Sequence, residues 1–187
     1  MSAGVVAIQG DFEKHIEAFR DIGVEALEIR LPKELSSVDR LVIPGGESTT
    51  VGLLMQRYGL GEAIKERAHQ GMPVWGTCMG MIMMARSVQG RPGQYTLDLL
   101  DVEVERNAFG AQVHSFEDLV KIEGLEEAVL GVFIRAPVIS HCGAAVTALG
   151  FYNDRVVAVR EGNRLGTSFH PELTEDRRLH RFFMEIG

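Results

Sequence analysis

The sequence predicts a single α/β domain with three layers, in which helices cover both faces of a central, mostly parallel sheet. Short apolar runs alternate with amphipathic helical patterns over the first half of the chain, which is typical of parallel strands joined by right-handed crossovers. The second half changes to short strands separated by turn residues, which indicates antiparallel strands added to the sheet. No stretch rich in Pro, Gly or Ser divides the chain, so we expect one domain over residues 1–187.

The first half is predicted to alternate strands with helices. Residues 5–8 are an apolar run ended by Gly10, which is typical of a buried strand. Phe12, Ile16 and Phe19 then recur at helical spacing, in a helix that ends near Gly23. The same patterns predict strands at residues 24–29, 40–43 and 73–75, and helices at residues 50–58, 62–69 and 79–86.

The second half is predicted to contain strands and one closing helix. Val102 and Val104 alternate with acidic residues, which favours a strand over residues 97–104. Asn153-Asp154 and Gly162-Asn163 are typical hairpin turns. The other strands are expected at residues 129–134, 138–140, 146–152, 155–160 and 165–169, and the helix at residues 175–186.

The composition is that of an ordinary globular protein. The 187 residues are 45% hydrophobic and 24% charged, and the formal net charge of −7 disfavours binding to a phosphate backbone. The two cysteines, Cys78 and Cys142, are too few for a disulfide framework or a four-cysteine zinc site. The sequence shows no apolar run of the roughly 18 residues that span a membrane, and no signal-peptide pattern. We therefore expect a cytoplasmic protein that binds neither nucleic acid nor membrane.

A cysteine at a strand–helix junction is the most informative feature. Gly76 and Gly80 lie two residues to each side of Cys78, as in a nucleophile elbow, where the sharp turn brings neighbouring backbone close. The sulfur would project at the positive N-terminal end of the helix, which favours the thiolate. The alternative is a buried structural cysteine, and we interpret Cys142 as packing in the core or at the edge of the site.

A thiolate nucleophile needs a base, and the base needs a group that orients it. His170-Pro171-Glu172 follows a predicted strand, and in an extended stretch the histidine and the glutamate would share one side. Glu172 can then hold one imidazole nitrogen while the other faces the sulfur. Both segments follow strands, and open α/β sheets place their sites at the carboxyl ends of strands. The alternative is a surface histidine or a hydrogen-bonded core histidine.

A glycine-rich loop follows a third predicted strand. Residues 43–50 read Ile-Pro-Gly-Gly-Glu-Ser-Thr-Thr, and paired glycines let backbone N–H groups face a ligand. A phosphate cradle is one interpretation, but the lysine and the spacing of a P-loop are absent. We predict instead that the N–H groups of Gly46 and Met79 form an oxyanion hole opposite Cys78. A tight turn with a helix cap is the alternative.

Together these segments resemble one family, the class I, triad-type glutamine amidotransferases. Within it, the chain resembles the glutaminase subunits of pyridoxal 5′-phosphate synthase along essentially its whole length. Besides the Gly-Thr-Cys-Met-Gly elbow, the matching segments are residues 7–12 (Ala-Ile-Gln-Gly-Asp-Phe), 44–49 (Pro-Gly-Gly-Glu-Ser-Thr), 105–110 (Glu-Arg-Asn-Ala-Phe-Gly), 133–137 (Phe-Ile-Arg-Ala-Pro) and 168–174 (Ser-Phe-His-Pro-Glu-Leu-Thr). The resemblance implies a class I glutamine amidotransferase-like fold, which is a flavodoxin-like three-layer sandwich.

The resemblance also implies roles for single residues. Cys78 would be the nucleophile, His170 the acid and base, and Glu172 its orienting partner. A guanidinium can bind the α-carboxylate of glutamine, and an acid can hold its α-ammonium. For either arginine alone, a surface ion pair is the alternative. The residues placed where the family contacts glutamine are Gly46, Glu47, Ser48, Arg106, Ile134 and Arg135. No metal and no cofactor is implied.

Three residues depart from the family pattern. Met79 follows the nucleophile where alanine is usual, although its N–H group remains. Ala111 and His114 stand where arginine and aspartate are more frequent. We expect these departures to affect partner contact or glutamine gating, and to leave the triad intact.

The predicted activity is hydrolysis of L-glutamine to L-glutamate and ammonia through a γ-glutamyl thioester. The resemblance implies a hetero-oligomeric complex with the barrel-shaped subunit of pyridoxal 5′-phosphate synthase, which would receive the ammonia for vitamin B6 biosynthesis and activate the glutaminase on docking. The alternatives are a glutaminase subunit of another biosynthetic synthase, an amidotransferase-like peptidase, and a catalytically silent partner-binding subunit.

Overall fold

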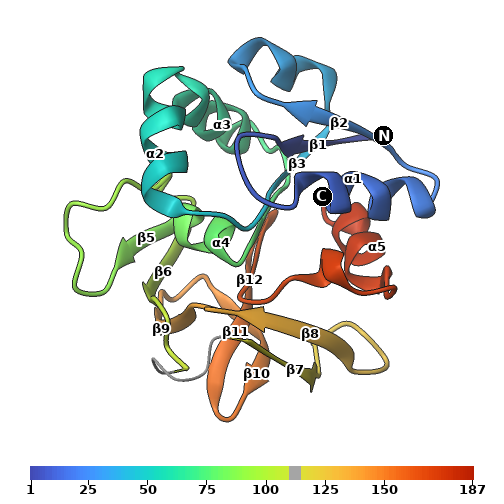
Figure 1. The fold of residues 1–187 in the computed structure, drawn as a ribbon, viewed down its shortest axis with the longest axis vertical. Helices are drawn as coiled ribbons and strands as arrows, with labels where there is room; N and C mark the ends of the chain where they lie inside the picture. Colours follow the sequence, from blue (N-terminus) through green and yellow to red (C-terminus); the bar gives the residue numbers. More distant parts are fainter. Residues whose placement is uncertain (110–114) are drawn as a thin grey trace.

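Figure 1 shows the computed structural model of the chain, which describes residues 1–109 and 115–187. Ten of the described strands form one mixed sheet. Its first half is parallel throughout, because each crossover returns the chain to the same end of the sheet. In spatial order the parallel strands are β2 (Glu25–Ile29), β1 (Ser2–Val6), β3 (Arg40–Ile43), β4 (Val74–Thr77) and β12 (Arg164–Thr167).

The remaining strands extend this sheet beyond β12, largely with antiparallel pairing. In spatial order they are β11 (Arg155–Glu161), β9 (Val138–Cys142), β6 (Leu100–Glu105) and β5 (Ala85–Val88), and β10 (Thr147–Tyr152) pairs with β11 outside this path. Only β5 and β6 pair in parallel in this half of the described sheet. A separate antiparallel hairpin consists of β7 (Ser115–Val120) and β8 (Val129–Ile134).

Helices cover both faces of the parallel half and bury two apolar cores (Figure 1). On one face, α1 (Phe12–Asp21) and α5 (Arg178–Glu185) pack around Trp75, which is fully buried. On the other face are α2 (Ser48–Arg57), α3 (Leu60–His69) and α4 (Met79–Met84). Two 3-10 turns, η1 (Pro32–Ser37) and η2 (Pro171–Leu173), complete the described elements. The predicted three-layer α/β fold with late antiparallel strands is confirmed.

Several predicted boundaries of strands and helices are wrong, because pairing with strands distant in the sequence decides where these elements begin and end. The helix expected over residues 79–86 ends at Met84, and the following residues form β5 beside β6. The strand expected at residues 5–8 is Ser2–Val6 instead. Gly4 has no apolar side chain to indicate a strand, yet a Cβ atom there would lie 2.8 Å from Ile29 Cγ1, so close packing excludes a larger residue. The strand β7 was not expected at all.

In the part of the chain that the structure describes, no helix has the length and apolar character needed to cross a membrane.

Candidate active site

Cys78 occupies a strained turn between β4 and α4. Its backbone has φ 50° and ψ −108°, a conformation that L-residues rarely adopt. A Cβ atom on Gly76 would lie 2.4 Å from the carbonyl carbon of Gly80, and one on Gly80 would lie 1.8 Å from the carbonyl oxygen of Ile43. The two glycines are therefore required by backbone contacts, which is the geometry of a nucleophile elbow.

The sulfur of Cys78 faces the end of β8. Its Sγ atom lies 3.8 Å from the carbonyl oxygen of Ile134, and the side chain is almost buried. The backbone N–H of Cys78 donates to the carbonyl of Thr167 at the end of β12, over 2.8 Å. The ends of β4 and β12 thus meet at the cysteine, as expected of the carboxyl edge of an open sheet, and the end of β8 in the separate hairpin closes on the sulfur.

His170 and Glu172 form a buried pair beside the cysteine. The imidazole Nδ1 lies 2.7 Å from Glu172 Oε1, and the backbone N–H of His170 donates to the Val132 carbonyl over 2.9 Å. The expectation that these residues lie in an extended stretch is wrong, because Pro171–Leu173 forms the turn η2. Proline is favoured at the first position of such a turn, where its missing N–H group is not needed. It is therefore the turn, and not an extended strand, that brings the side chains of His170 and Glu172 together.

The pKa values of this pair are shifted in opposite directions. Burial lowers the pKa of His170, but its interactions with Cys78 and Glu172 outweigh burial and raise the pKa to about 10. Burial raises the pKa of Glu172, but the His15 and His170 side chains outweigh it and hold the pKa well below its usual range. The geometry therefore favours an ionised glutamate beside a protonated imidazole.

A cavity of about 480 Å³ opens in front of Cys78 and His170. Its lining contains both predicted oxyanion-hole residues and all six residues predicted to contact glutamine. These are Gly46, Met79, Glu47, Ser48, Arg106, Ile134 and Arg135, with Gly46 counted in both sets. Glu172 lies behind His170, outside the lining. The volume suits a small polar molecule.

Two polar atoms at the cavity are buried without a hydrogen-bond partner among the described residues. They are Arg106 Nη1 and Ser48 Oγ. Leaving a buried guanidinium N–H unpaired is costly, so an anionic group in the cavity would stabilise it. Arg135 also lines the cavity, with a left-handed φ of 45° and an exposed side chain.

The carboxylate of Glu47 caps the N-terminus of α2, so its oxygens are already engaged by the backbone. It accepts hydrogen bonds from the backbone N–H groups of Thr49 and Thr50, at 3.0 and 2.8 Å. These two bonds lower the pKa of Glu47 to about 2. The backbone N–H of Glu47 donates to Gln9 Oε1 over 3.1 Å, which joins the glycine loop to the segment before α1.

Gln9, Asp11 and Asn107 also line the cavity, although no chemistry in the sequence singled them out. All three lie in segments that carry the family resemblance, and that was the only available signal. Atoms of Asp11, His170 and Glu172 lie within 4.8 Å of one another, a spacing that a metal ion could bridge. His170 Nδ1 and Glu172 Oε1 are already bonded to each other, which leaves a weak donor set.

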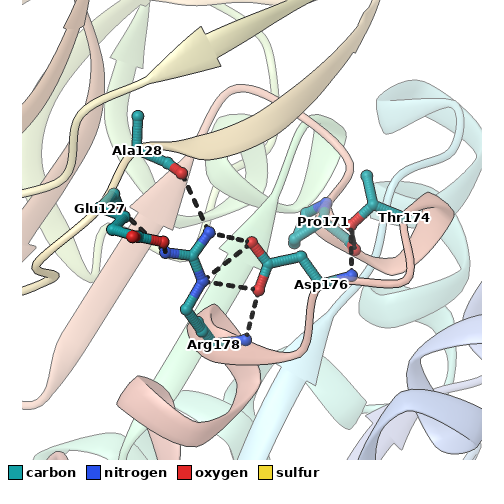
Figure 2. A network of polar contacts seen from close by, with 6 residues as sticks. All are labelled: Glu127, Ala128, Pro171, Thr174, Asp176 and Arg178. Atoms are coloured by element: carbon teal, nitrogen blue, oxygen red, sulfur yellow. Dashed lines mark hydrogen bonds and ion pairs between the residues drawn. The ribbon is translucent and has the colours of Figure 1, made fainter.

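Arg178 holds the segment after Glu172 against the turn of the β7–β8 hairpin (Figure 2). Its Nη2 donates to the Ala128 carbonyl over 2.9 Å and to Asp176 Oδ2 over 2.6 Å, and its Nη1 donates to the Glu127 carbonyl over 3.2 Å. Thr174 Oγ1 accepts from the backbone N–H of Asp176 and donates to the Pro171 carbonyl, at 3.2 and 3.1 Å. The loop that bears the His–Glu pair is thereby tied to β8.

Ala111 and His114, the two other departures from the family pattern, lie outside the described residues.

A cysteine elbow that faces a buried His–Glu pair at the carboxyl edge of a mixed sheet defines a class I glutamine amidotransferase-like protein. A solved structure described as a glutamine amidotransferase superposes with a TM-score of 0.95 at 47% identity, and the match covers 99% of this chain and 98% of that one. PurLQS from Thermotoga maritima shares the fold, with a TM-score of 0.72 at 18% identity over 98% of this chain and 97% of that one.

The chain belongs to the SNO glutamine amidotransferase family, which it matches over residues 5–186. It is 51% identical to the pyridoxal 5′-phosphate synthase subunit PdxT of Roseiflexus castenholzii, with both chains covered completely. It is also 51% identical to the subunit of the same name from Thermus thermophilus, over 98% of this chain and 96% of the relative.

Proposed function

We propose that the chain is a glutaminase that hydrolyses L-glutamine to L-glutamate and ammonia, with Cys78, His170 and Glu172 as its catalytic triad. The observation that carries this proposal is the convergence of Cys78 and the Glu172-bound ring of His170 on one cavity. Membership of the glutamine amidotransferase family supports the substrate.

In the first half-reaction, the Cys78 thiolate attacks the side-chain amide carbon of glutamine. The carbonyl oxygen becomes an oxyanion, for which the N–H groups of Gly46 and Met79 are the proposed donors. Since Nδ1 of His170 is bonded to Glu172, Nε2 is the nitrogen available to protonate the departing nitrogen. The C–N bond breaks, ammonia leaves, and a γ-glutamyl thioester remains on Cys78.

In the second half-reaction, water replaces ammonia. His170 Nε2 takes a proton from the water, whose oxygen attacks the thioester carbon. The C–S bond then breaks, which releases glutamate and restores the Cys78 thiolate beside the protonated imidazole. The negative charge of Glu172 stabilises that imidazolium at both stages, in accordance with the raised pKa of His170, about 10.

Charged groups around the cavity suit the free amino acid. Arg106, whose Nη1 has no partner within the described chain, and Arg135 are the proposed partners of the α-carboxylate. The carboxylate of Asp11, within 4.8 Å of His170, is available for the α-ammonium group of glutamine, whereas the Glu47 carboxylate is engaged with the backbone of α2. Glu47 is therefore proposed to contact glutamine through its backbone and to shape the loop through its side chain.

The proposed partner is the ammonia-accepting subunit of pyridoxal 5′-phosphate synthase. Two relatives at 51% identity are named as subunits of that synthase, and the match covers nearly all of each chain. Ammonia released into water at neutral pH becomes ammonium, which is a poor nucleophile, so delivery to a bound acceptor protects the product. We place the pair in the cytoplasm, where the thiol of Cys78 stays reduced.

The test is glutamate release from glutamine by the chain mixed with the synthase subunit. We expect Cys78→Ala to lower the rate at least about 1,000-fold and His170→Asn at least about 100-fold, as for other nucleophile–base pairs. Cys142→Ala, which removes a half-buried thiol outside the cavity, is the matched control with an unchanged rate. Full activity of Cys78→Ala would refute the mechanism.

The same mixture separates the alternatives. Glutamine labelled with ¹⁵N in the side-chain amide should transfer its label to the pyridoxal 5′-phosphate product. Glutamate release without transfer would indicate a different synthase partner. Hydrolysis of peptides in place of glutamine would indicate a peptidase, and the absence of hydrolysis with the partner bound would indicate a silent subunit.

A further inference from the structure

A buried polar chain continues behind Glu172, on the side away from the cavity. Glu172 Oε1 bonds to His170. Its second oxygen, Oε2, is buried without a hydrogen bond of good geometry among the described residues and lies 3.2 Å from His15 Nε2 on α1, within ion-pair distance. His15 Nε2 also lies 3.2 Å from Thr77 Oγ1, on the residue before Cys78. His15 Nδ1 lies 3.1 Å from His180 Nε2 on α5. These buried polar contacts therefore run from Glu172 through His15 to His180, and they connect α1, α5 and the strand that precedes Cys78.

The side chains of this polar chain are almost completely removed from water. His15, Thr77 and His180 are 0% exposed, and Glu172 is 2% exposed. Aromatic rings surround the histidines, since Trp75 lies edge-on to both rings and Phe19 to His180. Buried polar groups cost free energy unless they are hydrogen-bonded, and an apolar side chain would suit this core better. Stability alone therefore does not explain a histidine at position 15.

One assignment of protons to the two histidine rings leaves the fewest buried N–H groups without an acceptor. Burial and the neighbouring His15 lower the pKa of His180 well below its usual value, so His180 is neutral. If Nε2 of His180 donates to Nδ1 of His15, then the proton of His15 is on Nε2, which lies 3.2 Å from both Thr77 Oγ1 and Glu172 Oε2. His180 Nδ1, which has no partner among the described residues, is then an unprotonated nitrogen rather than an unpaired N–H group.

We propose that His15, oriented by His180, is a positioning residue for the carboxylate of Glu172. An N–H group on His15 Nε2, shared between Thr77 Oγ1 and the 3.2 Å contact with Oε2, limits rotation of the carboxylate, so Oε1 stays directed at His170 Nδ1. It also stabilises the ionised carboxylate in the core. His15 acts only through Glu172, and this inference rests on the proposed glutaminase function.

The charged and titratable groups around Glu172 explain the need for such a donor. His170 faces one oxygen and His15 the other, and the Asp11 carboxylate lies within 4.8 Å of the His–Glu pair. A second carboxylate so close disfavours ionisation of Glu172. The pKa of His180 is also lowered by Arg177 and raised by Glu172, both weaker effects than burial. Of these groups, His15 is the one that faces Oε2 from the core side.

The test compares two substitutions of His15 in the chain bound to its synthase subunit. His15→Gln keeps an N–H group near the position of Nε2, whereas His15→Leu fills space without a donor. We expect His15→Leu to lower kcat for glutamine hydrolysis about 10- to 100-fold, the worth of one hydrogen bond to a charged group, with KM nearly unchanged.

His15→Gln should restore kcat to within about fivefold of the wild type, since it keeps an N–H donor facing the carboxylate. His69→Leu, at an exposed histidine of α3, is the matched control with unchanged kinetics. Equal losses of kcat in both His15 variants would overturn the proposal, as would a wild-type kcat in His15→Leu.

A measurement on the wild-type chain keeps the proposal testable even if His15→Leu fails to fold. Long-range ¹H–¹⁵N NMR spectra distinguish the two tautomers of a histidine ring. We expect His15 to carry its proton on Nε2, and a proton on Nδ1 alone would overturn the inference. This measurement does not depend on turnover, so it tests the role of His15 even if the chain hydrolyses no glutamine. Absence of hydrolysis by the wild-type chain would instead refute the proposed glutaminase function.

Discussion

Gly80 faces the carbonyl oxygen of Ile43 so closely that a Cβ atom on Gly80 would lie 1.8 Å from it. The contact joins the first turn of α4 to the last residue of β3, which precedes the glycine-rich loop. Because the obstructing atom belongs to the backbone of a buried central strand, it cannot move aside as a flexible side chain would. The elbow can therefore pack this closely against the strand that leads into the glycine-rich loop only if position 80 has no side chain.

We expect Gly80→Ala to destabilise the fold by about 3 kcal/mol and to abolish most glutamine hydrolysis, because the elbow must shift to admit the methyl group. Urea unfolding and the glutamate-release assay measure the two effects. The matched control is Gly93→Ala, since a Cβ atom at Gly93 meets no atom within 4 Å. Equal stabilities of the two variants would contradict the contact as described.

Cys78 contributes to the raised pKa of His170, and removal of the thiol should reveal this. In Cys78→Ala we expect the pKa of His170 to fall from about 10 toward the ordinary value of 6.5, because burial then offsets more of the remaining attraction of Glu172. NMR titration of the ring carbons measures the shift. Cys142→Ala should leave it unchanged, and a value near 10 in Cys78→Ala would mean that Glu172 alone holds the proton.

The cap that Glu47 forms on α2 should contribute stability that depends on pH. We expect Glu47→Gln to lower the free energy of unfolding by about 1 kcal/mol at pH 7, the usual worth of an N-cap. The pKa of Glu47 is lowered from 4.5 to about 2 in the folded chain, so this contribution is complete above pH 4.5 and is lost as pH falls toward 2.

Urea unfolding of wild type and Glu47→Gln at pH 7 and pH 3.5 measures the pH dependence of the cap. The difference between the two proteins should narrow at the lower pH. Glu62→Gln, which removes an exposed carboxylate paired with Lys65, should change stability little at either pH. A difference that widens on acidification would contradict the capping role.

Local chemistry made the elbow and the His–Glu pair predictable from sequence. The tight turn at Cys78 requires Gly76 and Gly80 on both sides, and Pro171 restricts the segment between His170 and Glu172. These constraints act over a few residues, so the sequence displays them directly. The central strands were predictable for a similar reason, since burial on both faces demands continuous apolar runs.

Features that depend on distant contacts were not predictable in the same way. His15 and His180 are 165 positions apart, and only the packing of α1 against α5 makes them neighbours. Residues 85 and 86 continue a helical pattern, but pairing with β6 overrides it. The carboxylate of Glu47 suits both a ligand and a helix cap, and only the observed hydrogen bonds distinguish the two uses.

Arg178 offers a test of how firmly the loop that bears His170 and Glu172 must be held, because its bonds to Ala128 and Asp176 connect η2 and α5 to the β7–β8 hairpin (Figure 2). We expect Arg178→Ala to speed amide hydrogen exchange over residues 171–178 and to lower kcat severalfold, since His170 and Glu172 then vary more in orientation.

Arg178→Lys should recover part of the loss, because one ammonium can reach Asp176 but cannot also donate in a fixed fork to two carbonyls. Arg181→Ala, at an exposed arginine one turn further along α5, is the matched control and should leave exchange in this segment unchanged. Unaltered exchange in Arg178→Ala would mean that η2 is held by the backbone bond from His170 to Val132 and by the His–Glu pair alone.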